Sequence, residues 1–258
     1  MEKTFSFSIW AFINLIAFIA VVVVNGMANS LPLNGFGTGE LSDLYPNLFV
    51  PAGITFAIWG IIYLLLAGFS VYGLTAAFSK NIETLFLREI GPWFLISCMA
   101  NICWIFAWHW KKVGLSLFFM LIILASLIIL YRKIGIGSGE LSKRIFIFTK
   151  LPFSIYLGWI TVATIANITA LLVNLNWNGF GISETVWTVI VIIAAVIITC
   201  LVIYRQKDWG YALVVLWAFI GIILKRSSAG DAPAVVTAAG AGMAVIAAFY
   251  AVKQFILK

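Results

Sequence analysis

Apolar residues occur in long stretches along the chain, separated by short polar segments. A transmembrane helix needs roughly 20 apolar residues, and eight stretches are long enough: 8–29, 52–78, 91–110, 113–131, 151–174, 185–204, 209–225 and 233–257. None shows the alternating pattern of a barrel strand, and backbone groups in hydrocarbon must bond within their own segment. The pattern predicts an all-α integral membrane protein with about eight transmembrane helices.

Prolines and small residues add detail to these spans. Pro51, Pro92, Pro152 and Pro233 all fall at or near the predicted helix starts, where a missing N–H costs little. The last span is rich in Ala and Gly, which let helices approach closely. We expect it to pack against the other helices or against a second copy of the chain in a homodimer.

Composition supports the membrane assignment. Hydrophobic residues make up 64% of the chain and charged residues 10%, and the mean hydropathy is +1.11, which is unusual for a water-soluble domain. The 16 basic residues outnumber the 9 acidic ones. They form short clusters between spans, so they indicate membrane topology rather than nucleic-acid binding.

The distribution of Lys and Arg predicts the orientation. With the N-terminus inside, twelve basic residues are internal and four are external. The internal set is Lys3, Lys80, Arg88, Arg132, Lys133, Lys143, Arg144, Lys150, Arg205, Lys207, Lys253 and Lys258, and the external set is Lys111, Lys112, Lys225 and Arg226. Positive charge favours the cytoplasmic side. We therefore expect a multi-pass protein of the plasma membrane with both termini in the cytoplasm. Because its apolar run is longer than that of a usual signal peptide, we also expect the first helix to be retained.

Candidate catalytic groups are sparse. His109 is the only histidine, so a metal site has little support, and anchoring at the membrane boundary is the preferred interpretation. Cys98, Cys103 and Cys200 all lie within spans, where packing is the expected role. The nine acids lie in loops or at span ends, which gives no indication of a proton relay. We predict no catalytic residue, no metal and no required cofactor, and enzymatic activity is the less favoured interpretation.

Aromatic and amide side chains recur at helical spacing in three spans. Three lines of residues result: Phe56, Trp59 and Tyr63; Asn101, Trp104 and Trp108; and Trp159, Ala163, Thr164 and Asn167. Residues three and four apart share one face of a helix. Two interpretations are open, namely helix packing held by interhelical amide bonds, or an aromatic pocket for a flat apolar ligand.

Three segments resemble the TspO/MBR, or tryptophan-rich sensory, proteins. The segment "VPAGITFAIWGIIYLLLAGFSVY" (50–72) resembles their second helix, "ANICWIFAW" (100–108) their third and "LPFSIYLGWITVATIANITALLVNLN" (151–176) their fifth. The resemblance implies a five-helix core, residues 1–178. The three remaining spans, in residues 179–258, are predicted as additional helices beyond that core.

The same resemblance implies a site and a ligand. Trp59 and Trp159 match cavity tryptophans of the family, and Asn101, Trp104, Ala163 and Asn167 match other cavity or helix-contact positions. With Phe56 and Tyr63 of the second-helix pattern, these are the predicted ligand-binding residues. Residues 31–50 would form an extracytosolic lid, with Asn34, Tyr45 and Pro46 as its named residues and turns at Asn34-Gly35 and Gly37–Gly39.

The implied ligand is a porphyrin, a haem-like molecule or another hydrophobic compound, and the implied role is that of a receptor or sensor. A transporter for a small neutral or amphipathic molecule is the alternative. Weak photochemical degradation of porphyrin, centred on a tryptophan, is a third interpretation.

Overall fold

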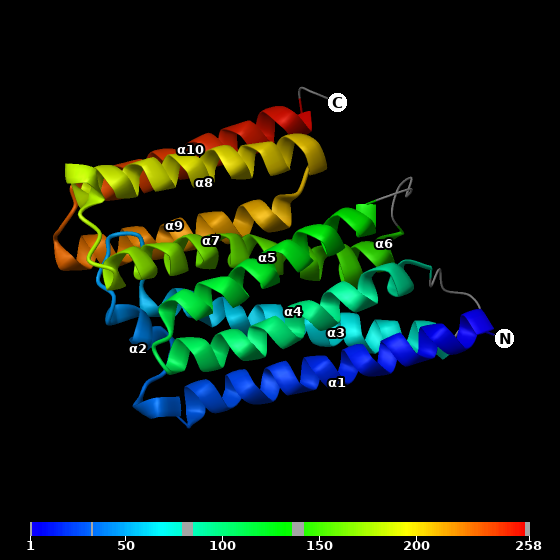
Figure 1. The fold of residues 1–258 in the computed structure, drawn as a ribbon. Coiled ribbons are helices and arrows are strands. Elements are labelled where there is room, and N and C mark those ends of the chain that lie inside the picture. The colour runs from blue at the N-terminus through cyan, green and yellow to red at the C-terminus, as the bar shows by residue number, and fades with distance from the viewer. Residues whose placement is uncertain (1, 32, 79–84, 136–141, 256–258) are drawn as a thin grey trace. The chain divides into compact units, whose positions relative to one another are not determined.

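The structure, a computed structural model, describes residues 2–31, 33–78, 85–135 and 142–255, and these residues form helices joined by short loops, with no strands (Figure 1). The elements are α1 (Glu2–Ser30), η1 (Leu33–Gly35), α2 (Thr38–Asp43), η2 (Gly53–Ala57), α3 (Ile58–Phe78), α4 (Leu85–His109), α5 (Val113–Gly135), α6 (Lys143–Ile145), η3 (Phe146–Lys150), α7 (Leu151–Asn174), η4 (Gly179–Gly181), α8 (Glu184–Gln206), α9 (Trp209–Ala229) and α10 (Pro233–Phe255). Lys80 and Lys258, which enter the charge count, and the predicted end of the last span at 257 lie outside these residues.

Within the described residues, eight helical segments are long and apolar enough to cross a membrane, which confirms the fold class predicted from the sequence. They are Ile9–Ser30, Gly53–Phe78, Ile90–His109, Val113–Ile134, Lys143–Asn174, Glu184–Gln206, Trp209–Ala229 and Pro233–Gln254.

The helices form two compact units. The first contains Met1–Thr38 and Ile58–Ile160, and the second contains Gly39–Ala57 and Thr161–Lys258. In the first unit α4 packs against α1 and α5, and α3 packs against α1. In the second unit α10 packs against both α8 and α9, and η2 contacts α9. Because the boundary falls between residues 160 and 161, α7 contributes to both units.

The centre of the first unit is aromatic. Phe69 of α3, Phe94 of α4 and Phe153 of α7 are almost completely buried. Their rings meet edge to face with centroid separations of 4.8 to 5.6 Å, a geometry that aromatic quadrupoles favour. These contacts hold three helices together without a polar atom.

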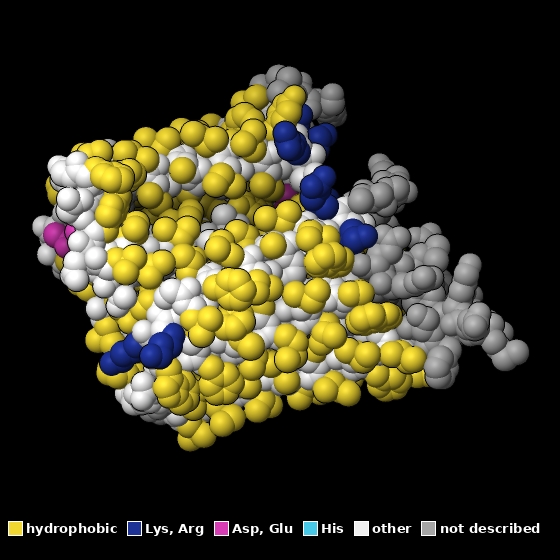
Figure 2. Space-filling model, in the orientation of Figure 1, with side chains coloured by type: hydrophobic (Ala, Val, Ile, Leu, Met, Phe, Trp, Pro, Cys, Tyr) yellow, Lys and Arg dark blue, Asp and Glu magenta, His cyan; other side chains and the backbone are white. Residues whose placement is uncertain are grey.

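The outward faces of the helices are apolar (Figure 2). Ile16, Leu64 and Ile197 are 66%, 74% and 54% exposed, and Lys and Arg on the face shown gather near helix ends. In water such a surface would drive association. In a bilayer it matches the hydrocarbon.

Two of the short connections between spans are genuine helix breaks. Lys111, between α4 and α5, and Lys207, between α8 and α9, have φ values of 56° and 50°. This left-handed conformation ends a helix. After the second break, the Asp208 carboxylate accepts the N–H of Tyr211 at 3.1 Å and caps α9, as N-terminal acids commonly do. The turns predicted at 109–114 and 205–210 are therefore correct, and each one separates two spans.

One of the predicted proline positions is wrong. Pro92 lies inside α4, about two turns after its first residue, Leu85. Pro152 is the second residue of α7, as predicted, and α6, η3 and α7 together form a continuous helical segment from Lys143. The η3 segment is a π-helical turn in which Leu151 donates to the Phe146 carbonyl. Such a turn is one way to accommodate the N–H that Pro152 lacks.

Candidate functional site

The segment that was predicted as a lid contains two short helices. Asn34 and Gly35 in η1 have φ values of 57° and 84°, so the sharp turn expected there is confirmed. The turn expected at Gly37–Gly39 is wrong, because α2 starts at Thr38 and includes Gly39. The composition suggested a turn at the two glycines, whereas the six residues from Thr38 to Asp43 form a short helix.

His109 forms hydrogen bonds that hold the start of this segment against the end of α4. Its Nδ1 lies 2.9 Å from the Leu33 carbonyl oxygen and its Nε2 lies 3.0 Å from the Thr38 hydroxyl. The Asn34 amide donates to the His109 carbonyl at 2.9 Å. The Trp108 indole N–H donates to the Thr38 carbonyl at 3.2 Å. His109 is fully buried. It therefore links two segments inside the protein and does not act as the membrane-interface anchor that its sequence neighbours suggested.

Four aromatic rings of α3 and α7 gather inside the first unit. Trp59 stacks on Tyr63, with centroids 5.5 Å apart and ring planes 24° from parallel. The rings of Tyr156 and Trp159 lie edge to face with the Trp59 ring, with centroid separations of 5.9 and 6.4 Å. The structure therefore brings together three predicted site residues, Trp59, Tyr63 and Trp159. We call these rings, with Tyr156, the aromatic cluster.

Asn101 supplies a polar group next to the aromatic cluster. It accepts a 2.8 Å hydrogen bond from the Asn25 amide and donates to the Tyr156 hydroxyl at 3.5 Å. All three residues are buried. The amide joins α1, α4 and α7, as the packing interpretation predicted for an amide in hydrocarbon.

Two members of this network were missed by the sequence analysis. Tyr156 lies three residues before Trp159, a spacing that places both on one helix face. Asn25 is an amide within the first apolar span, and that isolated polarity was the signal that could have identified it.

Trp104 forms a second stacked pair with Trp108. The ring centroids are 6.2 Å apart and the planes 11° from parallel, which confirms that the two rings share a face of α4. Trp104 is only 7% exposed. Its indole Nε1 is buried and has no hydrogen-bond partner among the described residues. A buried donor without a partner is unusual and costly.

The remaining predicted site residues belong to the second unit. Ala163 and Asn167 follow Trp159 at four-residue intervals on α7, and Asn167 is buried. Phe56 lies in η2, a 3₁₀ segment, rather than in the α-helix. The helical spacing that grouped Phe56 with Trp59 therefore does not apply at this position.

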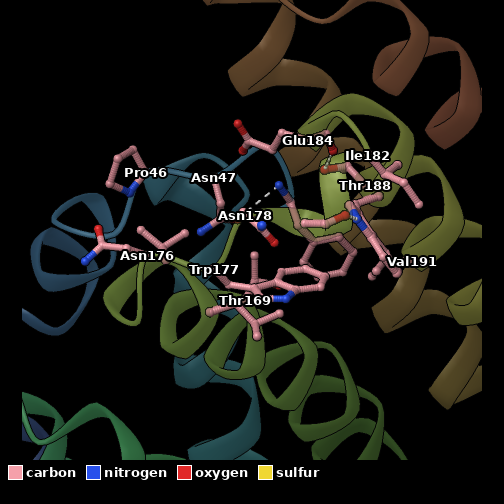
Figure 3. Close-up of a pocket in the computed structure, with 15 residues that line it drawn as sticks. Pro46, Asn47, Thr169, Asn176, Trp177, Asn178, Ile182, Glu184, Thr188 and Val191 are labelled. Carbon is pink, nitrogen blue, oxygen red and sulfur yellow. Dashed lines mark hydrogen bonds between the residues drawn. The ribbon is translucent and has the colours of Figure 1, made fainter.

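The second unit contains a pocket of about 440 Å³. Figure 3 shows residues from the segment around Pro46, the end of α7 and the start of α8 surrounding it. Its lining residues are Pro46, Asn47, Phe49, Thr169, Leu172, Val173, Asn176, Trp177, Asn178, Gly179, Ile182, Glu184, Trp187, Thr188 and Val191. We call it the α7–α8 pocket. Most of this lining is apolar, and Glu184 is its only charged residue.

Pro46 and Tyr45, both predicted lid residues, take part in pockets of the second unit. Pro46 lines the α7–α8 pocket, and Tyr45 and Pro46 both line a neighbouring pocket that contains charged residues. Burial raises the pKa of the Tyr45 phenol above its usual value of 10. Tyr45 therefore stays neutral at ordinary pH.

The fold and the buried aromatic and amide groups define a multi-pass α-helical membrane protein. The model of the family described as TSPO-like protein matches residues 8–252. The chain therefore belongs to the TSPO-like protein family, as its three sequence segments predicted. No curated protein and no solved structure matches it.

Family membership places this chain among membrane proteins of the sensor or receptor kind. The match continues through α8, α9 and α10. The division into a five-helix core at 1–178 and three additional helices at 179–258 stays a prediction.

Proposed function

We propose that the protein is a membrane receptor or sensor that binds a hydrophobic, tetrapyrrole-like ligand at the aromatic cluster. The observation that carries this proposal is the contact of Trp59 with Tyr63, Tyr156 and Trp159. Flat apolar molecules bind well against several aromatic faces that come from different helices. The family assignment supports the same kind of function.

Polar groups would orient the ligand. The Asn101 amide lies beside the cluster through its bond to Tyr156, and Trp104 offers a buried N–H that has no acceptor among the described residues. A ligand with an acceptor atom at its edge would satisfy such a donor. In this proposal Leu33–Thr38, held by His109, covers the site.

The experiment is fluorescence titration of the purified protein with a graded series of porphyrins. The test variants are Trp59→Phe and Trp159→Phe, and the matched control is Trp110→Phe, because Trp110 is 50% exposed. We expect saturable quenching in the micromolar range, which corresponds to about −8 kcal/mol. Both test variants should weaken binding while the control should not. Quenching that neither saturates nor depends on Trp59 and Trp159 would leave the aromatic cluster with a packing role only.

Transport is the second candidate function. Many transporters place their substrate site near the bilayer midplane, and a neutral substrate needs no buried charge. Proteoliposomes distinguish the two functions, because a receptor binds its ligand without concentrating it inside the vesicle. Light-dependent bleaching of bound porphyrin that Trp59→Phe abolishes would instead support the third, enzymatic function.

A further inference from the structure

A second pocket in the second unit contains the charged residues near the ends of α2 and α9. Its volume is about 460 Å³, and its lining residues are Ser42, Asp43, Tyr45, Pro46, Asn47, Leu48, Val50, Glu184, Lys225, Arg226 and Asp231. We call it the charged pocket. It shares Pro46, Asn47 and Glu184 with the α7–α8 pocket. The two pockets therefore adjoin, one mainly apolar and one charged.

Arg226 is the most unusual residue of the charged pocket. It is 8% exposed, and its Nη1 donates to the Asp231 carboxylate at 3.0 Å. Its Nε is buried and has no hydrogen-bond partner in the described part of the chain. A guanidinium has five N–H donors, and a buried charge is costly unless its donors are paired. An oxyanion is the group that pairs best with such a donor.

Lys225 provides a second cation that a ligand can reach. Its Nζ lies 2.7 Å from an Asp43 carboxylate oxygen, and the two side chains are 28% and 66% exposed. An exposed ion pair contributes little net stability. Asp43 can therefore move into solvent and leave Lys225 to an incoming anion at small cost.

The three acids of the charged pocket outnumber its two bases, but each acid already has a donor. Asp43 and Asp231 accept from the two bases. Glu184 accepts the Leu48 backbone N–H at 2.8 Å. Glu184 is also the first residue of α8, where the helix dipole favours a negative charge. Among the described residues, the buried side-chain atom of this pocket that has no partner is Nε of Arg226.

We propose that the adjoining pockets form one binding site for an amphiphile with an oxyanion head group, a phosphate or a carboxylate. Arg226 binds the oxyanion with help from Lys225. The apolar part lies in the α7–α8 pocket against Phe49, Leu172 and Trp177. These residues belong to the second unit, so the proposal does not depend on the aromatic cluster of the first.

The test is calorimetric titration of the full-length protein in a nonionic detergent, with empty micelles as the blank. The probes are octyl phosphate, inorganic phosphate, octanol and octyltrimethylammonium. We expect octyl phosphate to bind saturably and more tightly than the other three. Equal binding of inorganic phosphate would remove the apolar pocket from the site. Equal binding of octanol or of the ammonium compound would overturn the oxyanion assignment.

Variants localise the site. Arg226→Gln should weaken octyl phosphate binding about tenfold or more, because it removes hydrogen bonds to a charged group. Arg226→Lys should restore it only in part. Arg205→Gln, at the end of α8 and outside both pockets, is the matched control. Unchanged binding in Arg226→Gln would overturn the proposal.

Two further variants keep the test decisive if Arg226→Gln does not fold. Lys225→Gln changes only an exposed pair, and it should weaken octyl phosphate binding severalfold. Leu172→Asn should weaken octyl phosphate but leave inorganic phosphate unchanged. Wild-type affinity in both variants would contradict the proposal. Competition by phosphatidylglycerol would assign the head group to a bilayer lipid, and lack of competition would assign it to a diffusible amphiphile.

Discussion

Gly221 of α9 lies directly against Thr55 of η2. A β-carbon at position 221 would overlap the Thr55 hydroxyl and approach Cβ of Pro51 to 2.8 Å. The backbones also bond, because Ala52 donates its N–H to the Gly221 carbonyl at 3.0 Å. The Trp217 indole donates to the Thr55 carbonyl one turn away at 2.9 Å. A missing side chain thus allows η2 to lie on α9.

Gly221→Ala should destabilise the second unit. The added methyl group would clash with Thr55 and Pro51 at atoms on or next to the β-carbon, which cannot move without the backbone. Overpacking of this kind costs about 1–3 kcal/mol. Unfolding by a graded denaturing detergent measures the change. Gly240→Ala is the control, since nothing lies within 4 Å of a β-carbon there. Equal stability of the two variants would show that η2 does not pack on α9 as described.

His109→Ala should release Leu33–Thr38 from α4. The substitution removes both ring contacts and leaves the Leu33 carbonyl without that partner, at a cost of about 1–3 kcal/mol. Limited proteolysis between residues 31 and 38 measures the release. Trp110→Phe tests for a general effect at this helix end, because Trp110 is exposed. Unchanged protection in His109→Ala would mean that other contacts hold the segment.

The Asn25–Asn101 bond should be measurable as a coupling energy. We expect the double-mutant cycle of Asn25→Leu and Asn101→Leu to give about 0.6–1.7 kcal/mol, the range found between membrane helices. Stability of the four proteins in the same detergent provides the cycle. Strictly additive effects would show that the two amides do not depend on each other.

Trp104→Phe should change stability and ligand binding in opposite directions. Removing a buried donor that has no partner avoids its desolvation cost, on the order of 1–3 kcal/mol, while the phenyl ring keeps most of the packing. Thermal unfolding without ligand should therefore show equal or higher stability. If the indole N–H binds the ligand, porphyrin affinity should fall. A variant with lower stability and unchanged affinity would assign Trp104 a packing role.

Much of the fold could be predicted because the bilayer imposes a simple rule. A span of about 20 apolar residues must be helical in hydrocarbon, and all eight spans follow from that rule. Local spacing also predicted the pairing of Trp59 with Tyr63 and of Trp104 with Trp108. Both pairs lie four residues apart on one helix, so no tertiary information was needed.

The rest could not be predicted because it depends on contacts between distant segments. His109 was expected at the membrane interface, but its two nitrogens bond to residues more than 70 positions away. Asn25 and Tyr156 became part of the Asn101 network only through the packing of α1, α4 and α7. Two other features, the π-helical turn before Pro152 and the helix around Gly39, were missed for a different reason, because they depend on local backbone geometry that composition does not encode.

The sequence by itself determined the solvent, the number of spans and the family, because these follow from hydropathy summed over many residues and from local motifs. Tertiary structure alone decided which side chains meet. It joined Trp59 to Trp159, and it brought Glu184 and Arg226 into one pocket. The physical reason is that burial of an apolar face specifies a helix without specifying its neighbour, whereas a particular hydrogen bond or ring contact requires both partners in place.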